Sequence, residues 1–200
     1  MDSEINNIKM EFYSLLSKLL SSEAEEERFG KVQSVLFEYL HSFTLNMTKI
    51  SFKEMVDLKA LCFCFPKPPL IYPKTQEEAV ELWQSGATIS IQALEKRSYF
   101  FNEVCKKVAE NLVYEVTCSM YISKPDGISF SYHVDEWEGL ALQVVGEKVF
   151  KIKDDNGNIA DYILKPSNWL RISPEDVHLA ETNEYSVHLN FALHRKFKLS

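Results

Sequence analysis

The chain has 200 residues, of which 46% are hydrophobic, so it can bury one sizeable core but is too short for several domains. Its formal net charge of −7 argues against a nucleic-acid-binding protein, which presents a basic face, and against binding to an anionic membrane. The four cysteines lack the spacing of a disulfide framework, and the acidic N-terminus lacks the apolar segment of a secretion signal, so we expect free thiols in a cytoplasmic protein.

The first third of the chain has helical periodicity. Apolar residues recur at helical spacing over residues 4–20 and 23–43, and Ser51–Glu54 matches a capping box before a short third helix. The proline-rich run Phe65–Pro73 can be neither a helix nor a central strand, because proline lacks an amide donor and fixes φ. We therefore expect an N-terminal helical lobe over residues 1–64 and a second domain over residues 65–200.

The second domain begins with helices and continues with short strands. Thr75–Glu78 forms another capping box, and Gly86 is placed to end the helix that this box starts. Residues 87–93 alternate like a strand, and Tyr99–Leu112 has the apolar stripe of a helix. From Val113 the period changes to two, which predicts strands over 114–122, 129–135, 140–145, 148–152, 162–164, 169–172, 177–180 and 186–193. This pattern is typical of a mainly β, antiparallel sandwich or small barrel.

Three residues carry the strongest chemical signal: His133, Asp135 and His178. On an extended strand, positions 133 and 135 point the same way, so both side chains can reach one ion while Val134 points away. His178 would then come from a distant strand of the same barrel. Two imidazoles and one carboxylate on one face of a metal form the ligand set of non-haem Fe(II) oxygenases. By themselves, these three residues would fit other metal-binding cupins as well.

Two more polar residues fit the interior of such a barrel. Lys148 falls on the strand that follows a turn, and a cation fixed inside a barrel needs an anion, which a dicarboxylate cosubstrate would supply. The alternative is an ordinary surface lysine, as Lys151 and Lys153 illustrate. His188 on the last strand could face the same interior, or it could be a hydrogen-bonded core histidine.

Several segments resemble the Jumonji C oxygenases, in particular their ribosomal oxygenase branch. The resemblance covers residues 64–193 and rests on four segments in the same order, Leu82–Ile91, Tyr121–Asp135, Leu142–Phe150 and Leu164–Glu181. It implies a double-stranded β-helix, also called a jelly-roll or cupin-like fold, that binds Fe(II) through His133, Asp135 and His178.

The resemblance also implies a 2-oxoglutarate site. Lys148 matches the position that pairs with the distal carboxylate of this cosubstrate, and we assign Tyr121, His188 and Asn190 to the same pocket. Ser119 stands where the family often has a longer asparagine, so its contact with 2-oxoglutarate is an open question. Tyr132, Trp137 and Glu138 flank the ligand segment and are our candidates for the substrate entrance, with packing or surface roles as the alternative.

The implied activity is that of a dioxygenase that hydroxylates an amino-acid side chain in a peptide or protein, with succinate and CO₂ as coproducts. Asp135 favours hydroxylation, because related halogenases lack this carboxylate. Two alternatives stay open: a hydroxylase of a free amino acid or small metabolite, and a non-catalytic cupin-like binding module. The helical lobe could form a homodimer or cover the mouth of the barrel. The dimerisation and winged-helix domains of ribosomal oxygenases have no counterpart in these 200 residues, so the resemblance does not name a substrate.

Overall fold

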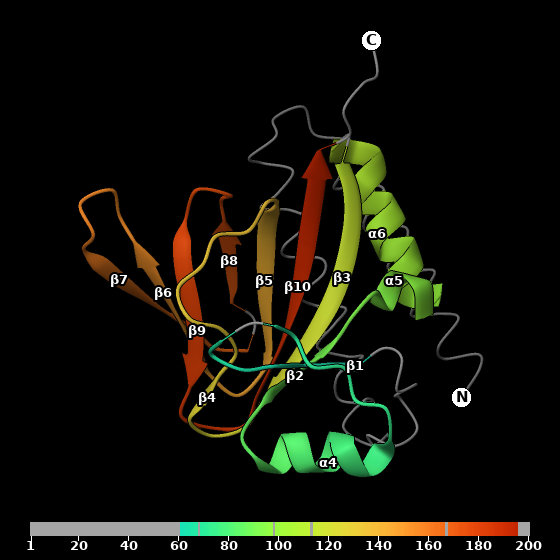
Figure 1. Ribbon diagram of the computed structural model, residues 1–200. Coiled ribbons are helices and arrows are strands. Elements are labelled where there is room, and N and C mark those ends of the chain that lie inside the picture. The colour runs from blue at the N-terminus through green and yellow to red at the C-terminus, as the bar shows by residue number, and fades with distance from the viewer. Residues whose placement is uncertain (1–60, 68, 98, 113, 167, 196–200) are drawn as a thin grey trace.

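Two antiparallel β-sheets face each other, with helices against the outer side of the larger one (Figure 1). The computed structural model describes residues 61–195, apart from 68, 98, 113 and 167. The predicted helices over residues 4–20 and 23–43 and the capping box at Ser51–Glu54 lie outside the described residues. Leu61–Cys64, which fell at the end of the predicted helical lobe, is the first described strand, β1.

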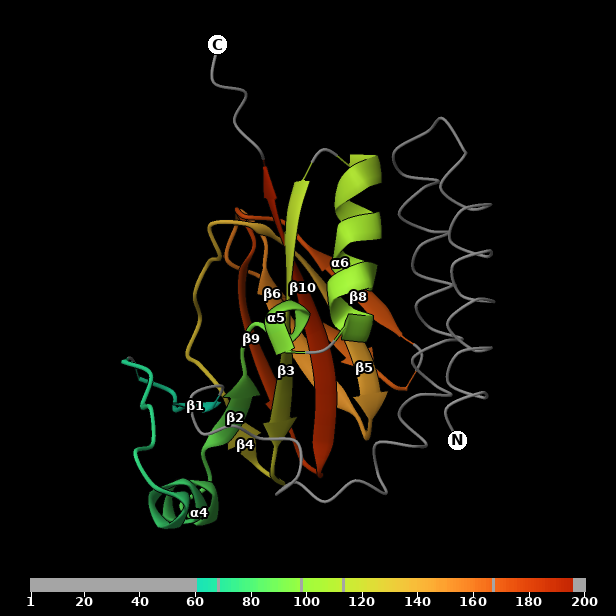
Figure 2. The same ribbon diagram turned by 90° about the vertical axis from the view of Figure 1, so that its right-hand side faces the viewer.

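The larger sheet has six strands, and its two faces differ sharply in polarity. Its order is β1, β2 (Thr88–Ile91), β3 (Tyr114–Ser123), β10 (Ser186–Arg195), β5 (Glu138–Val145) and β8 (Trp169–Ile172). The outer face carries the main apolar core, with Met120, Leu142, Leu189 and Phe191 among its members. Helices α5 (Leu94–Arg97) and α6 (Tyr99–Leu112) lie against β3 (Figure 2).

The inner face of this sheet is polar, because side chains alternate along each strand. Asn190 pairs with Ser119 of β3 on one side and with Ala141 of β5 on the other. One step along the same face, His188 pairs with Tyr121 and Gln143. The strand register therefore lays polar and small side chains in rows across the inner face.

The smaller sheet closes the interior. Its order is β4 (Gly127–Ile128), β9 (Val177–Thr182), β6 (Lys148–Lys153) and β7 (Ile159–Leu164). Phe150, Leu164 and Ala180 of this sheet pack with Ala141 and Ile172 of the other sheet in a second, smaller core. The prediction of a mainly antiparallel two-sheet fold is therefore confirmed.

Helix α4 (Gln76–Gln84) begins and ends where the sequence predicts. It begins after Thr75, whose hydroxyl accepts from the Glu78 amide at 3.2 Å. The Glu78 carboxylate accepts from the amide of Lys74, at 2.7 Å, instead of the capping residue's own amide. Gly86, with a φ of +98°, follows the end of α4 as expected.

None of the described helices is long and apolar enough to cross a membrane. All four cysteines are buried and free, as predicted.

One predicted strand is wrong. Residues 129–135 do not form a strand, because β4 ends at Ile128 and the chain then runs as a loop to the start of β5. In that loop, one pair of residues bonds to the smaller sheet. His133 and His178 form an isolated antiparallel bridge, with reciprocal N–H···O bonds of 3.0 and 2.9 Å. The bridge sets two of the predicted metal ligands directly beside each other.

Candidate metal centre

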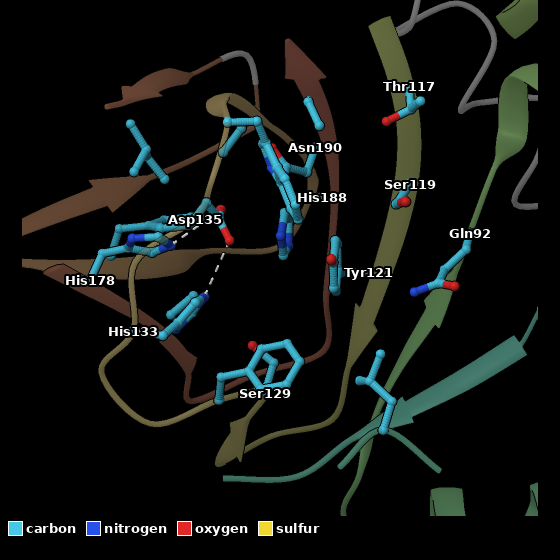
Figure 3. A pocket seen from close by; sticks show the side chains of 18 of the residues that line it. Gln92, Thr117, Ser119, Tyr121, Ser129, His133, Asp135, His178, His188 and Asn190 are labelled. Carbon is cyan, nitrogen blue, oxygen red and sulfur yellow. Dashed lines mark ion pairs between the residues drawn. The ribbon is translucent and has the colours of Figure 1, made fainter. Parts of the chain in front are cut away.

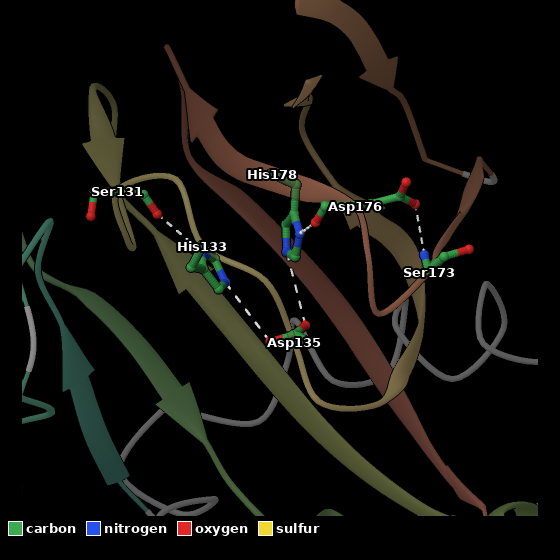
Figure 4. Close-up of polar contacts among 6 residues, drawn as sticks. All are labelled: Ser131, His133, Asp135, Ser173, Asp176 and His178. Atoms are coloured by element: carbon green, nitrogen blue, oxygen red, sulfur yellow. Dashed lines mark hydrogen bonds and ion pairs between the residues drawn. The ribbon is translucent and has the colours of Figure 1, made fainter. Parts of the chain in front are cut away.

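His133, Asp135 and His178 converge, although the first two lie on a loop and the third on β9. One ligand atom from each residue lies within 4.8 Å of the other two, which is close enough for one ion to contact all three. Each imidazole Nε2 is 3.9 Å from an oxygen of the Asp135 carboxylate (Figure 4). In the described part of the chain, no other group of three His, Cys, Asp or Glu side chains converges in this way.

Backbone carbonyls orient both histidines identically. The Nδ1 of His133 lies 2.9 Å from the carbonyl oxygen of Ser131, and that of His178 lies 2.9 Å from that of Asp176. A carbonyl only accepts, so each Nδ1 must donate, and the lone pair of the neutral ring then lies on Nε2, where a metal can bind. The turn before β9 is itself fixed, since the Asp176 carboxylate accepts from the Ser173 amide at 2.7 Å.

Burial favours the metal-binding form of His178. Its pKa is lowered mainly because the buried imidazole loses hydration when charged, and the neighbouring His133 lowers it further. Hydrogen bonding to the Asp176 carbonyl and the charge of Asp135 oppose the shift. The ring is therefore held neutral, and only a neutral imidazole can ligate a metal.

A cavity of about 660 Å³ opens from this triad along the inner face of the larger sheet (Figure 3). Six of the residues predicted for the cosubstrate or substrate line it: Ser119, Tyr121, Tyr132, Trp137, His188 and Asn190. The cavity continues past Ser119 to Thr117 and His194, whose side chains lie 3.3 Å apart. It is large enough for a small dicarboxylate together with a substrate side chain.

Lys148 crosses the interior between the two sheets. Its side chain is fully buried and does not line the cavity, and its Nζ donates to the Ser123 hydroxyl at 2.6 Å. The Ser123 hydroxyl in turn lies 3.0 Å from that of Thr88. Burial lowers the pKa of Lys148 to about 8. Among the described residues, Lys148 forms no ion pair with a carboxylate.

His188 of β10 and Tyr121 of β3 form part of the inner face of the larger sheet beside the metal ligands. Their rings stack with centroids 4.9 Å apart and planes 6° apart, and Phe150 meets the His188 ring edge-on at 5.7 Å. The pKa of His188 is well below its ordinary value, first because the ring is buried and second because the Lys148 ammonium is nearby. His188 is therefore a neutral residue of the cavity wall, near the buried cation.

The three substrate candidates fare differently. The Tyr132 ring lies 3.8 Å from the Lys153 ammonium, and the Trp137 ring packs against His194 at 5.3 Å, so both sit at the cavity wall. Glu138 does not line the cavity. It lies on the outer face of β5, where it is buried and ion-paired with Arg171. The alternation of β5 explains this placement, since Glu138 is one position out of step with the inner-facing residues.

Sequence reasoning missed Ser123, Thr88, Thr117 and Asp176. Serine, threonine and aspartate are common residue types, and although Thr88, Ser123 and Asp176 fall inside the segments that resemble the family, nothing in those segments singles them out. Only the strand register places the first three on the inner face, and only the turn before β9 reveals the contribution of Asp176.

No protein-family model matches the chain. The bifunctional lysine-specific demethylase and histidyl-hydroxylase NO66 of Drosophila persimilis is 26% identical over 195 residues, which span 84% of this chain and 26% of that protein. YcfD, a ribosomal oxygenase from Escherichia coli, is similar in structure. Its complex with cobalt and succinic acid gives a TM-score of 0.58 at 14% identity, over 74% of this chain and 45% of that one. Its complex with cobalt and 2-oxoglutarate gives 0.55 at 13%, over 69% and 40%.

The chain thus spans about a quarter of the curated relative that it matches and under half of the YcfD structures. The structural similarity shows that the two sheets form the cupin-like double-stranded β-helix, so the predicted fold class is confirmed. The resemblance to Jumonji C proteins of the ribosomal oxygenase branch is confirmed as well.

Proposed function

We propose that this chain is an Fe(II)- and 2-oxoglutarate-dependent dioxygenase that hydroxylates an amino-acid side chain in a peptide or protein. The observation that carries the proposal is the convergence of His133, Asp135 and His178, with both Nε2 atoms freed by carbonyl contacts at Nδ1. The relatives support it, since NO66 is named a histidyl-hydroxylase and YcfD a ribosomal oxygenase.

The donor set fits ferrous iron. His133, Asp135 and His178 would hold such an ion through two imidazole nitrogens and one carboxylate oxygen, the donor set of non-haem iron sites. When bound, the metal supplies the activation of O₂ that couples oxidative decarboxylation of 2-oxoglutarate, to succinate and CO₂, to hydroxylation of a C–H bond. The chain's part is to hold the metal and to orient its ligands through the carbonyl contacts at Nδ1.

Lys148 is the residue that we assign to the distal carboxylate of the cosubstrate. A buried ammonium with one hydroxyl partner is unfavourable until an anion neutralises it. The Ser123 and Thr88 hydroxyls lie next to the ammonium and could donate to the same carboxylate. His188 and Tyr121 line the cavity as one cross-strand pair, and Asn190 and Ser119 line it as the next pair along the same two strands.

The test is turnover of 2-oxoglutarate by the purified chain with Fe(II), measured as succinate formed without added substrate. We expect slow uncoupled succinate formation, which His178→Ala and Asp135→Ala abolish. Glu175→Gln alters an exposed carboxylate near the same turn and should leave the rate unchanged. Tight metal binding without any succinate would instead favour the non-catalytic binding module. Stimulation by free amino acids, but not by peptides, would select the small-metabolite hydroxylase.

A further inference from the structure

Among the described residues, a short extra segment lies beside β1 at one edge of the larger sheet. Ile71 pairs with Phe63 through two backbone hydrogen bonds, with N···O distances of 3.0 and 2.7 Å. These bonds extend the six-stranded sheet by one extended residue and its neighbours. In the part of the chain that the structure describes, the segment Leu70–Tyr72 is therefore the outermost part of the sheet on this side.

The neighbours of Ile71 present unused backbone groups. Successive residues of an extended chain turn their N–H and C=O groups to opposite sides, so those of Leu70 and Tyr72 point away from β1. Within the described chain, neither residue uses these groups in a hydrogen bond. An edge of this kind is a template for another strand.

The side chains of the segment connect this edge to the metal cavity. Phe63 belongs to the core on the outer face, so its direct partner Ile71 shares that face, and Leu70 and Tyr72 share the inner one. Leu70 accordingly lines the cavity that holds the triad. A strand added at this edge would turn every second side chain toward the inner face, and the one beside Leu70 toward this cavity.

The surface around the edge segment Leu70–Tyr72 is apolar, and the backbone of the segment is already extended. Tyr72 is 55% exposed and Ile71 37%, and Val134, between two of the metal ligands, is 53% exposed. Prolines at 69 and 73 bracket the segment, and Pro73 biases Tyr72 toward extended backbone, which lowers the entropy cost of presenting an extended edge. The proline-rich run Phe65–Pro73 is also joined to the loop that carries His133 and Asp135, because the Ser131 amide donates to the Pro66 carbonyl at 3.1 Å.

We propose that Leu70–Tyr72 docks an extended stretch of substrate polypeptide as the next antiparallel strand. This choice of occupant rests on the proposed function, since the inward side chain is the one delivered to the metal. The peptide residues opposite Leu70 and Tyr72 point inward and exchange backbone hydrogen bonds with them. The residue between them points outward beside Ile71, where an apolar side chain fits best.

The experiment uses the full chain loaded with Mn(II) and 2-oxoglutarate, so that binding is measured without turnover. The probe is a positional-scanning pool of nine-residue peptides with blocked ends, and fluorescence polarisation measures the binding of each peptide. Tyr72→Pro removes the amide donor, and Tyr72→Ala is the matched control that removes only the side chain. Melting temperature and Mn(II) affinity report whether each variant folds.

We expect that Tyr72→Pro binds the selected peptide about three- to tenfold more weakly than Tyr72→Ala, as one lost backbone hydrogen bond predicts. N-methylation of the peptide residues opposite Leu70 and Tyr72 removes amide donors to this edge and should weaken binding at least about tenfold. N-methylation of the residue between them should leave binding unchanged. Three results would overturn the inference: no binding by any pool, equal affinity of the two variants, or indifference to the methylated position. A dimer that Tyr72→Pro dissociates would assign the edge to a second copy instead.

Failure of the docking and failure of the proposed function give different results. An inactive chain that still shows the alternating methylation pattern refutes the hydroxylase and keeps the docking edge. A chain that turns over 2-oxoglutarate but ignores Tyr72→Pro keeps the oxygenase and loses the docking edge.

Discussion

Replacing Lys148 with methionine should stabilise the fold and abolish cosubstrate binding at the same time. Methionine keeps the length of the apolar stem but removes the buried charge. The gap between the ordinary lysine pKa of 10.5 and the value of about 8 that burial imposes corresponds to about 3 kcal/mol. Loss of the hydrogen bond to Ser123 lowers the stability of the variant by about 1 kcal/mol. The net gain of about 2 kcal/mol should raise the melting temperature by about 4–8 °C.

The pH dependence of this gain has a definite sign. Because the pKa of Lys148 is lower in the folded than in the unfolded protein, the folded state releases this proton first as the pH rises. The unfolded state then holds more protons between about pH 8 and 10.5, and the wild type gains stability across that window. The advantage of Lys148→Met is therefore full below pH 8 and fades toward pH 10.5.

Urea unfolding at pH 7 and pH 10 measures the stability, and calorimetric titration of the Mn(II)-loaded protein measures 2-oxoglutarate binding. Lys151→Met is the matched control, because Lys151 lies on the same strand but pairs with Glu181 at the surface. It should leave cosubstrate binding intact. A Lys148→Met protein that is less stable than the wild type at pH 7, and still binds 2-oxoglutarate, would refute the reasoning.

Three further predictions concern the metal ligands and two turns. Asp135→Ala should weaken Mn(II) binding at least about 100-fold in calorimetric titrations, because one of three ligands is lost. Asp176→Ala should cost about tenfold in the same assay, since the turn that orients His178 loses its side-chain acceptor. Asp176→Asn keeps an acceptor oxygen, so an equal loss would contradict this explanation. Gly146→Ala should destabilise the fold by more than about 2 kcal/mol, because a Cβ there would lie 2.1 Å from the Tyr185 carbonyl oxygen. Gly157→Ala has open space at a similar positive φ and should cost about 1 kcal/mol in urea unfolding.

Local patterns carried much of the fold prediction. Helix α6 has the predicted bounds, Tyr99–Leu112, and β8 has the predicted bounds, Trp169–Ile172. Their periodicity is a property of neighbouring residues, so it can be read without knowledge of the partner elements. The run from Ser129 to Asp135 alternates equally well but forms one bridge instead of a strand, because pairing partners across the sheet decide that outcome.

The candidate site was predictable where residue type limits the chemistry. His133, Asp135 and His178 have side chains suited to one metal ion, the neighbouring family-like segments raised their weight, and the structure brings them together. Whether a residue faces inward depends instead on strand parity. Glu138 is one position out of step with the inner face and pairs with Arg171 outside the cavity. Serine hydroxyls such as that of Ser123 become recognisable only through the contact with Lys148.

The separation of polarity between the two faces of the larger sheet has an evolutionary consequence. The outer face holds the folding core, whereas Thr117, Ser119 and Ala192 on the inner face lie outside both apolar clusters. Mutations at these three positions can therefore change the shape of the cavity while the residues of the apolar core stay unchanged. A lineage built on this scaffold can change its substrate in small steps without passing through unfolded intermediates, and directed libraries at the same positions should retain an unusually high fraction of folded members.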